Sequence, residues 1–136
     1  MATKKLKNEL VVGNRSLAEQ IICDLLRFHF KKLNISTNDK SILGRQEIDI
    51  YLKDIKFAIE VDGPTHSKPI FGEATFLRMQ EADARKSKKL DELGIKLYRI
   101  ALPDKSSDYY AFLKKEVSDN LVVEINRWLT NRDVVS

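Results

Sequence analysis

The sequence predicts an α/β (α+β) domain with a mixed sheet, because it contains a hairpin pattern, a strand–helix–strand order and an amphipathic helix at each end. Two alternating apolar and polar stretches meet at a short turn within QEIDIYLKDIKFAIEVD, residues 46–62. A helix pattern and a third apolar stretch, residues 95–100, come next, and this order predicts a right-handed parallel crossover. At 136 residues the chain has the length of one domain, expected over 16–136 after a basic arm at 1–15.

The first helix is expected from residue 16 to about residue 32. Ser16 and Glu19 have the spacing of a capping box, in which Ser16 caps the helix and Glu19 returns a hydrogen bond to it. The single cysteine, Cys23, lies in this helix, so we expect no internal disulfide and no structural zinc site. The expected apolar stripe consists of Leu17, Ile21, Ile22, Leu25, Leu26 and Phe28.

The hairpin at residues 46–62 has a register that its own alternation predicts. With the turn at 53–56, antiparallel pairing places every apolar residue opposite an apolar partner, and a slip by one residue would separate all these pairs. The same register places Asp49 opposite Glu60. The apolar pairs are Leu52 with Phe57, Ile50 with Ile59, and Ile48 with Val61.

Asp49, Glu60 and Asp62 are expected to share the polar face of this hairpin. Carboxylates that lie opposite each other on paired strands repel unless a cation or a shared proton relieves them. An all-oxygen cluster suits a hard divalent cation, Mg²⁺ first; Mn²⁺ is expected to substitute for it, and zinc is not expected. The alternative is that these residues form the solvated face of a half-exposed hairpin.

The segment after the second strand places a histidine beside the acidic face. Gly63 and Pro64 end the strand, and His66 follows within the same turn. Because histidine titrates close to neutral pH, His66 is the candidate general base or acid; the alternative is a structural or exposed turn residue. In the loop at 67–75, Phe71 is expected to lean on or insert into a base step, unless this loop is a lid or a disordered turn.

A second long helix is expected over residues 73–93 and ends at Gly94. Its inward stripe includes Asp83, and a buried carboxylate needs a partner, so we expect Asp83 to contact His66 or the water at the metal, or else a cation from residues 85–86. The apolar members of the stripe are Phe76, Met79, Leu90 and Leu93. The opposite face carries a basic ridge that could follow a phosphate backbone or simply be solvated, formed by Arg78, Arg85, Lys88 and Lys89.

The C-terminal helix is expected over residues 107–131 and has a broad apolar face. Packing across the sheet is its expected role, with a contact to a second copy or a partner protein as the alternative. Residues 34–41 and 103–108 are rich in turn formers and are expected to be loops. The apolar face consists of Phe112, Leu113, Val117, Leu121, Ile125 and Trp128.

Composition favours a protein of the cytoplasm with a polyanionic partner. The net charge is +4 and the pI is about 9.1, a mild excess that fits nucleic acid without requiring it. No apolar run approaches the ~20 residues of a membrane span, and residues 1–7 lack the apolar core of a secretion signal.

The segments QEIDIYLKDIKFAIEVDGPTH and DARKSKKLDELGIKLYRI resemble the PD-(D/E)XK nuclease superfamily. More narrowly, they are similar to the very-short-patch-repair endonucleases and the phage homing endonucleases with the EDxHD motif. The similarity covers residues 16–100. It implies a restriction-endonuclease-like core and a bacterial or phage-encoded enzyme of the cytoplasm.

The resemblance assigns roles to residues at matching positions. Asp49 takes the place of the metal-binding aspartate, and Glu60 that of the acidic residue in the (D/E)xK strand. Asp62 stands where that motif has lysine, a departure that the EDxHD branch shares and that passes proton transfer to His66. Glu19 matches the first glutamate of the family.

The implied activity is Mg²⁺-dependent hydrolysis of phosphodiester bonds in DNA. Asp49 and Glu60 would hold the metal, His66 would take a proton from the attacking water, and Asp83, the last aspartate of the motif, would orient His66. The leading alternative comes from IEVDGPTH, residues 59–66, which also resembles the RAP domain of RNA-binding proteins and implies RNA binding without catalysis. A third interpretation is a subunit of a larger nuclease complex.

Overall fold

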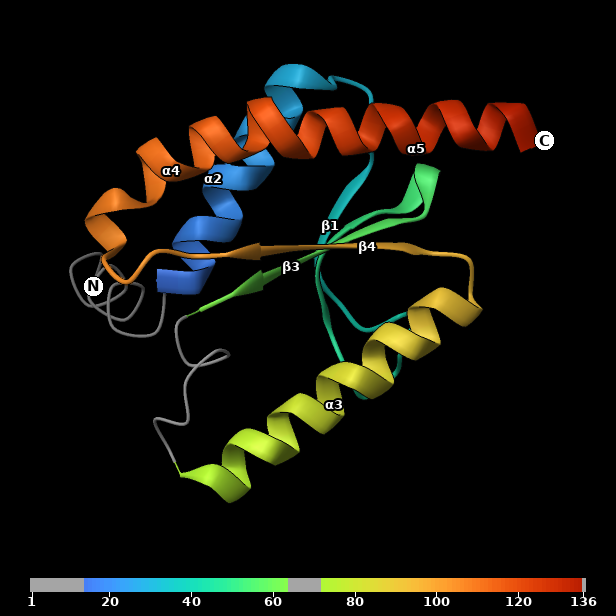
Figure 1. The fold of residues 1–136 in the computed structure, drawn as a ribbon. Helices are drawn as coiled ribbons and strands as arrows, with labels where there is room; N and C mark the ends of the chain where they lie inside the picture. The colour runs from blue at the N-terminus through green and yellow to red at the C-terminus, as the bar shows by residue number, and fades with distance from the viewer. Residues whose placement is uncertain (1–13, 64–71, 136) are drawn as a thin grey trace, which may run out of the picture.

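The structure, a computed structural model, describes residues 14–63 and 72–135 of the chain. Figure 1 shows how helices and strands alternate along it. The elements are, in order, α2 (Asn14–His29), β1 (Ile35–Asp39), β2 (Ile48–Leu52), the 3₁₀ turn η1 (Lys53–Ile55), β3 (Phe57–Asp62), α3 (Glu73–Glu92), β4 (Lys96–Ala101), the 3₁₀ turn η3 (Ser106–Asp108), α4 (Tyr109–Glu116), the π-helical segment η4 (Val117–Leu121) and α5 (Val122–Val135).

The described strands form one mixed sheet in the order β1-β2-β3-β4. β1 and β2 pair antiparallel, β2 and β3 pair antiparallel, and β3 and β4 pair parallel. The connection from β3 to β4 contains α3, as expected from the strand–helix–strand order. The prediction of a mixed α/β domain with a hairpin and a parallel crossover is therefore confirmed.

The register of the hairpin is confirmed for two of its three predicted apolar pairs, whereas Ile48 and Val61 are not paired in the described ladder and lie in different apolar clusters. Leu52 pairs with Phe57 and Ile50 pairs with Ile59, as the matching of apolar partners requires. The connecting turn is η1 followed by Lys56, which has a positive φ of 53° although no glycine or asparagine marks the site. The backbone of Lys56 then anchors the crossover, because its carbonyl accepts the Lys96 N–H at 3.0 Å.

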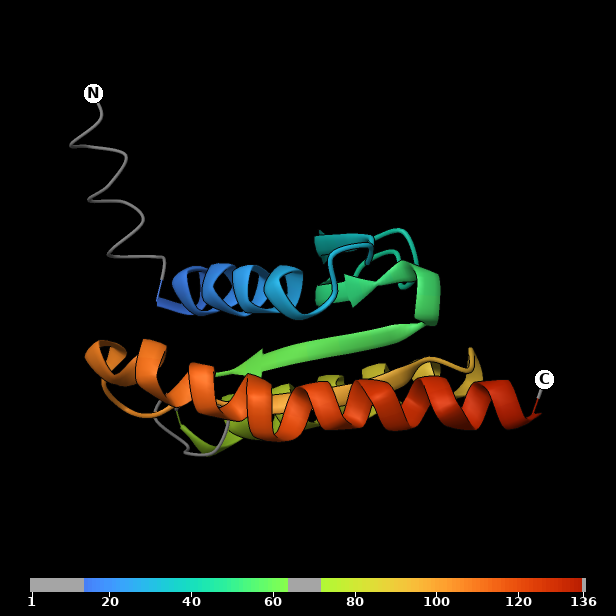
Figure 2. The ribbon, with the colours of Figure 1, turned by 90° about the horizontal axis from the view of Figure 1, so that it is seen from above.

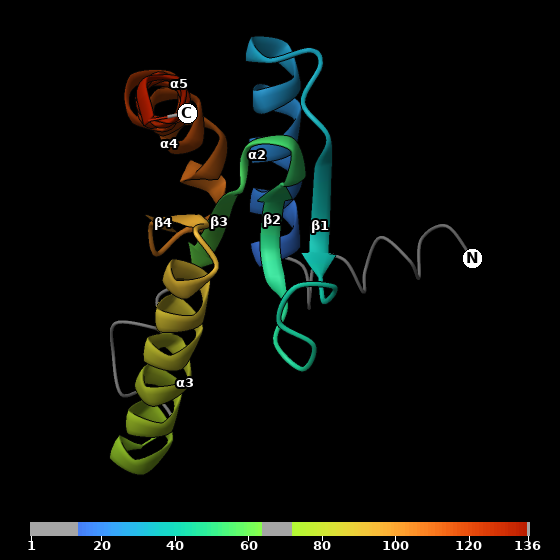
Figure 3. The same ribbon diagram turned by 90° about the vertical axis from the view of Figure 1, so that its right-hand side faces the viewer.

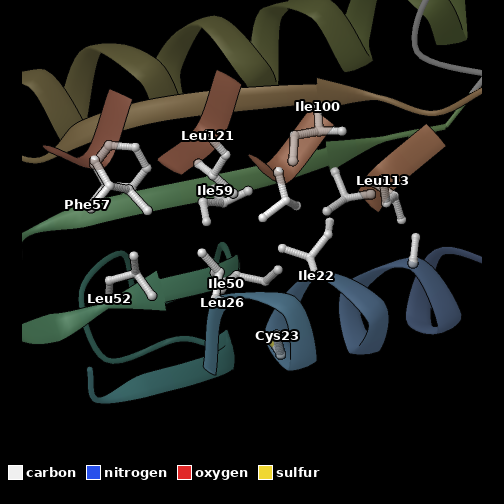
Figure 4. Close-up of a cluster of buried hydrophobic side chains, with 14 of the residues drawn as sticks. Ile22, Cys23, Leu26, Ile50, Leu52, Phe57, Ile59, Ile100, Leu113 and Leu121 are labelled. Carbon is white, nitrogen blue, oxygen red and sulfur yellow. The ribbon is translucent and has the colours of Figure 1, made fainter. Parts of the chain in front are cut away.

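The helices cover the sheet unequally. α2 and the α4–α5 helix lie on one side of it, and α3 lies on the other (Figures 1 and 3). Figure 2 shows α2 running alongside the C-terminal helix, with β3 visible between them. The main core fills this side, and Figure 4 shows its side chains from α2, β2, β3, β4 and the C-terminal helix pointing toward one another.

The C-terminal helix packs across the sheet, as predicted. Four of its residues are spaced four positions apart. Four residues of a regular α-helix turn by about 400°, so the direction of each side chain around the helix axis would drift by about 40° from that of the one before it. The π-helical turn η4 holds more residues per turn and offsets this drift. All four residues are completely buried: Leu113, Val117, Leu121 and Ile125.

A smaller apolar cluster lies under α3. It joins Leu90 and Ile95 to the sheet, and its other members are Leu43, Ile48, Tyr51 and Ala58. Only the C-terminal part of α3 takes part. Farther toward its N-terminus the helix carries the exposed Leu77 and extends past the strands (Figure 1).

Several predicted boundaries were wrong. Within residues 34–41, strand β1 (Ile35–Asp39) replaces the expected loop, because its backbone pairs with β2 along an edge where polar side chains face solvent. α2 begins at Asn14, so Ser16 lies within its first turn and is not the N-cap, and it ends at His29 rather than near residue 32. Leu17 and Phe28 of its expected stripe, and Leu93 at the end of α3, are exposed.

Candidate functional site

Asp49 and Glu60 lie side by side where the β2–β3 ladder ends. The Asp49 N–H donates to Glu60 Oε2 at 2.9 Å, and the Val61 N–H donates to Asp49 Oδ2 at 2.8 Å. Each carboxylate thus takes a backbone donor from the neighbouring strand. Both side chains are buried, each residue being 5% exposed. The structure therefore brings together the two central residues that the hairpin register predicted.

Lys86 brings a positive charge to this pair from helix α3. The residue is 7% exposed, and its ammonium donates to Glu60 Oε1 in a buried ion pair. Sequence reasoning considered Lys86 only as a partner for Asp83. The signal was present, because Lys86 is three residues after Asp83 and four before Leu90, a spacing that places all three on one helix face.

Burial and like charge act together on Glu60. Removal from water raises the pKa of the Glu60 carboxyl, and the neighbouring Asp49 charge raises it further. The Asp49 N–H and the Lys86 ammonium act in the opposite direction without cancelling the shift. The ionised Glu60 is therefore held at an energetic cost that additional positive charge would reduce.

Asp62 and Asp83 meet Arg99, which projects from β4 on the same face of the sheet. Arg99 Nη1 lies 3.4 Å from Asp62 Oδ1 and 4.0 Å from Asp83 Oδ2, and Nη2 donates to Ser87 Oγ at 3.0 Å. The Asp83 side chain is 34% exposed, so the prediction that it is buried was wrong. Arg99 was missed, although the alternation of β4 places Leu97 and Arg99 opposite the core face.

A pocket of about 270 Å³ lies between the sheet and α3, next to these contacts. We call it the acidic pocket, because five of its lining side chains are carboxylates and only one of its described lining residues, Lys86, is cationic. Its lining residues are Gln46, Glu47, Asp49, Glu60, Val61, Asp62, Asp83 and Lys86.

The donor set of the acidic pocket suits Mg²⁺. Within the described residues, no group of three or more carboxylate, histidine or cysteine side chains has the spacing of a metal site. Mg²⁺, however, is commonly held by one or two carboxylates, with waters and substrate phosphate completing its shell. The Asp49–Glu60 pair provides two, and a carboxylate oxygen that accepts one hydrogen bond keeps a second lone pair. Asp62, the third predicted ligand, lines the same pocket but contacts Arg99.

Glu19 lies elsewhere, in a second pocket of about 230 Å³ beside α2 and β1. The residue is buried, but it is not among those lining the acidic pocket. Cys23 lines the same second pocket, and burial raises the pKa of its thiol to about 11, so the thiol stays protonated at neutral pH. The structure thus separates Glu19 from the Asp49–Glu60 pair with which the resemblance grouped it.

The four residues of the basic ridge, Arg78, Arg85, Lys88 and Lys89, are all exposed on α3. At 3.6 residues per turn, they are rotated about a third of a turn from Asp83 and Lys86, which face the pocket. The ridge is therefore a separate surface of the same helix. His66 and Phe71 lie outside the described residues, so their predicted roles stay predictions.

No helix in the described part of the chain is long and apolar enough to cross a membrane. Comparisons of the chain with protein-family models, with curated proteins and with solved structures found no match.

Proposed function

We propose that this protein is a Mg²⁺-dependent nuclease that hydrolyses phosphodiester bonds, with DNA as its expected substrate. The observation that carries the proposal is the buried Asp49–Glu60 pair at the base of the acidic pocket. Two adjacent buried carboxylates are costly to a fold. The Asp49 N–H and the Lys86 ammonium offset only part of this cost, because the pKa of Glu60 stays raised. Their arrangement is explained if they bind a cation.

The fold around the pair supports the same proposal. An antiparallel hairpin leads directly into a parallel crossover, and both carboxylates lie at the end of the hairpin ladder, on the face that α3 covers. This is the arrangement expected from the resemblance to PD-(D/E)XK nucleases, so we propose that the sheet and its helices form a restriction-endonuclease-like core.

The residues of the chain have distinct roles in the proposed reaction. Asp49 and Glu60 would hold the metal, which when bound polarises the phosphate and offsets its developing negative charge. His66, assigned from the sequence, would take the proton of the attacking water. Arg99 offsets part of the negative charge of Asp62 and Asp83 at the side of the pocket, which limits the repulsion that an approaching phosphate meets.

Asp49→Asn provides the direct test of the nuclease proposal. Asparagine can still accept the Val61 N–H, so the hairpin should stay intact while the negative charge is lost. The assay would follow supercoiled plasmid, single-stranded DNA and RNA in Mg²⁺, Mn²⁺ or EDTA. We expect metal-dependent cleavage by the wild type and a loss of at least about 10²-fold in the variant, as the loss of several kcal/mol of charge stabilisation predicts.

A matched control is Asp91→Asn, which removes the same charge from an exposed position of α3 outside the pocket. Its activity should equal that of the wild type. Full activity in Asp49→Asn would exclude this site. Tight RNA binding by a wild-type protein that cuts none of the substrates would favour the binding module instead.

His66→Ala tests the second half of the mechanism. Loss of a general base typically lowers the rate by about 10²- to 10⁴-fold. We expect the variant to bind substrate normally but to cleave it slowly, and the pH–rate profile should lose the limb near neutral pH. An unchanged profile would show that another group accepts the proton.

A further inference from the structure

The acidic pocket presents an electrostatic problem to the substrate of the proposed reaction. Its lining carries five carboxylates, and a phosphodiester that enters it brings one more negative charge. A single divalent cation leaves an excess of negative charge at the site. The protein must therefore supply positive charge that faces the pocket.

Lys86 is placed to supply that charge. It is the one cationic side chain among the described residues that line the pocket, and it is buried there rather than exposed. Its ammonium contacts Glu60 Oε1, while the other Glu60 oxygen accepts the Asp49 N–H. The charge is thus fixed beside both carboxylates that would hold the metal.

The other cations near the pocket have different positions. Arg99 pairs with Asp62 and also lies near Asp83 and Ser87, and it is not among the residues that line the pocket. The basic ridge is rotated about a third of a turn away on α3. In the strand itself, Asp62 occupies the second position after Glu60, so that position supplies no cation.

We propose that Lys86 binds the phosphate of the substrate in this pocket, and that Glu60 holds its ammonium in place until the substrate arrives. The proposal rests on the nuclease function and names the residue that meets the anion. An ammonium has three N–H donors, so Lys86 can contact Glu60 and a phosphate oxygen at the same time. No covalent bond to Lys86 forms or breaks in this role.

Binding of a fluorescein-labelled DNA duplex, with Ca²⁺ in place of Mg²⁺, tests this role without requiring cleavage. Lys86→Met should lower the affinity about tenfold or more, the usual loss for a hydrogen bond to a charged group. The slope of log affinity against log salt concentration should fall by about one phosphate contact, roughly 0.9. Lys86→Arg keeps the charge and should retain the slope.

Titration of the protein alone with Mn²⁺ separates this role from a structural one. Removing a cation beside Asp49 and Glu60 reduces the repulsion that a divalent ion meets, so Lys86→Met should bind Mn²⁺ as tightly as the wild type or more tightly. A distorted pocket would bind both Mn²⁺ and DNA less tightly. Lys115→Met, on the exposed side of α4, removes the same charge far from the pocket and should change neither measurement.

Lys86→Met leaves Glu60 without its cation, so the variant could unfold. In that case the double variant Glu60→Gln with Lys86→Met is compared with Glu60→Gln alone, and the double variant should have the smaller salt slope. An unchanged affinity and slope after loss of Lys86 would overturn the proposal. If DNA binding depends on Lys86 but the wild type cleaves no substrate, the role of Lys86 holds and the nuclease function is refuted. If the wild type cleaves DNA but loss of Lys86 leaves the salt slope unchanged, the nuclease function holds and the role of Lys86 is refuted.

Discussion

The two faces of the β2–β3 hairpin are equally buried but differ in chemistry. On the face covered by α2 and the C-terminal helix, Ile50 and Ile59 pair within a continuous apolar core. On the face covered by α3, Asp49 and Glu60 occupy neighbouring strand positions and are buried almost as completely. The first face follows from the hydrophobic effect alone. The second is apolar around Tyr51 and Ala58, but burial of Asp49 and Glu60 at its end opposes that effect. This difference is the one that the proposed metal site would explain.

A third carboxylate with low exposure, Asp39, has the opposite balance between burial and hydrogen bonding. Asp39 is as buried as Glu60, yet hydrogen bonds from Ser41 and Ser36 lower its pKa to about 2. Lys53 adds a cation 3.7 Å away. The Asp39 carboxylate stabilises the β1–β2 connection, whereas the pKa of Glu60 is raised, first by its burial and then by the neighbouring Asp49 charge.

The largest effect on stability is expected from the apolar face. Phe57 is completely buried and stacks on Tyr98, with ring centroids 6.3 Å apart. Phe57→Ala should lower the free energy of unfolding by about 3–5 kcal/mol, measured by urea denaturation. Leu77→Ala, at an exposed position of α3, should change it by less than about 0.5 kcal/mol. Similar losses in both variants would mean that the core is not where the structure places it.

A smaller, pH-dependent loss is expected for Asp39→Asn. The pKa of Asp39 falls from 3.8 to about 2 on folding, so its contribution is fully present above pH 3.8 and is lost as the pH falls through 2. The shift corresponds to about 2 kcal/mol. Urea denaturation should show that the difference in free energy of unfolding between wild type and variant is smaller near pH 2 than at neutral pH. A difference that is independent of pH would assign the effect to packing.

The sequence predicted the hairpin well, because its apolar alternation leaves one register in which every partner matches. Ile50 with Ile59 fixes that register, and Asp49 beside Glu60 follows from it without further assumptions. The crossover to β4 was predicted for a similar reason, since a helix between two apolar stretches leaves few topologies.

The cations of the site were not predicted, because their identification needs three-dimensional information. Lys86 lies in a run of basic residues, and only its angle around α3 separates it from the exposed ridge. Arg99 contacts Asp62 of the neighbouring strand and Asp83 of α3, which are both distant from it in sequence. Strand β1 was missed because its alternation is weak and its stability comes from pairing with β2.

The smallest effect on stability is expected on the acidic face, from removing both charges of the buried pair. Glu60→Gln with Lys86→Met removes the Glu60–Lys86 ion pair as a whole, while Asp49 keeps the hydrogen bond from the Val61 N–H. Replacements of a buried ion pair are often neutral or stabilising by about 1–4 kcal/mol. The free energy of unfolding should therefore equal or exceed that of the wild type, while Lys86→Met alone should be less stable than the double variant. Nuclease activity should be lost in both. A double variant that is several kcal/mol less stable than the wild type would show that the Glu60–Lys86 pair stabilises the fold. In that case both faces of the hairpin would contribute to stability, and the contrast drawn between them would be wrong.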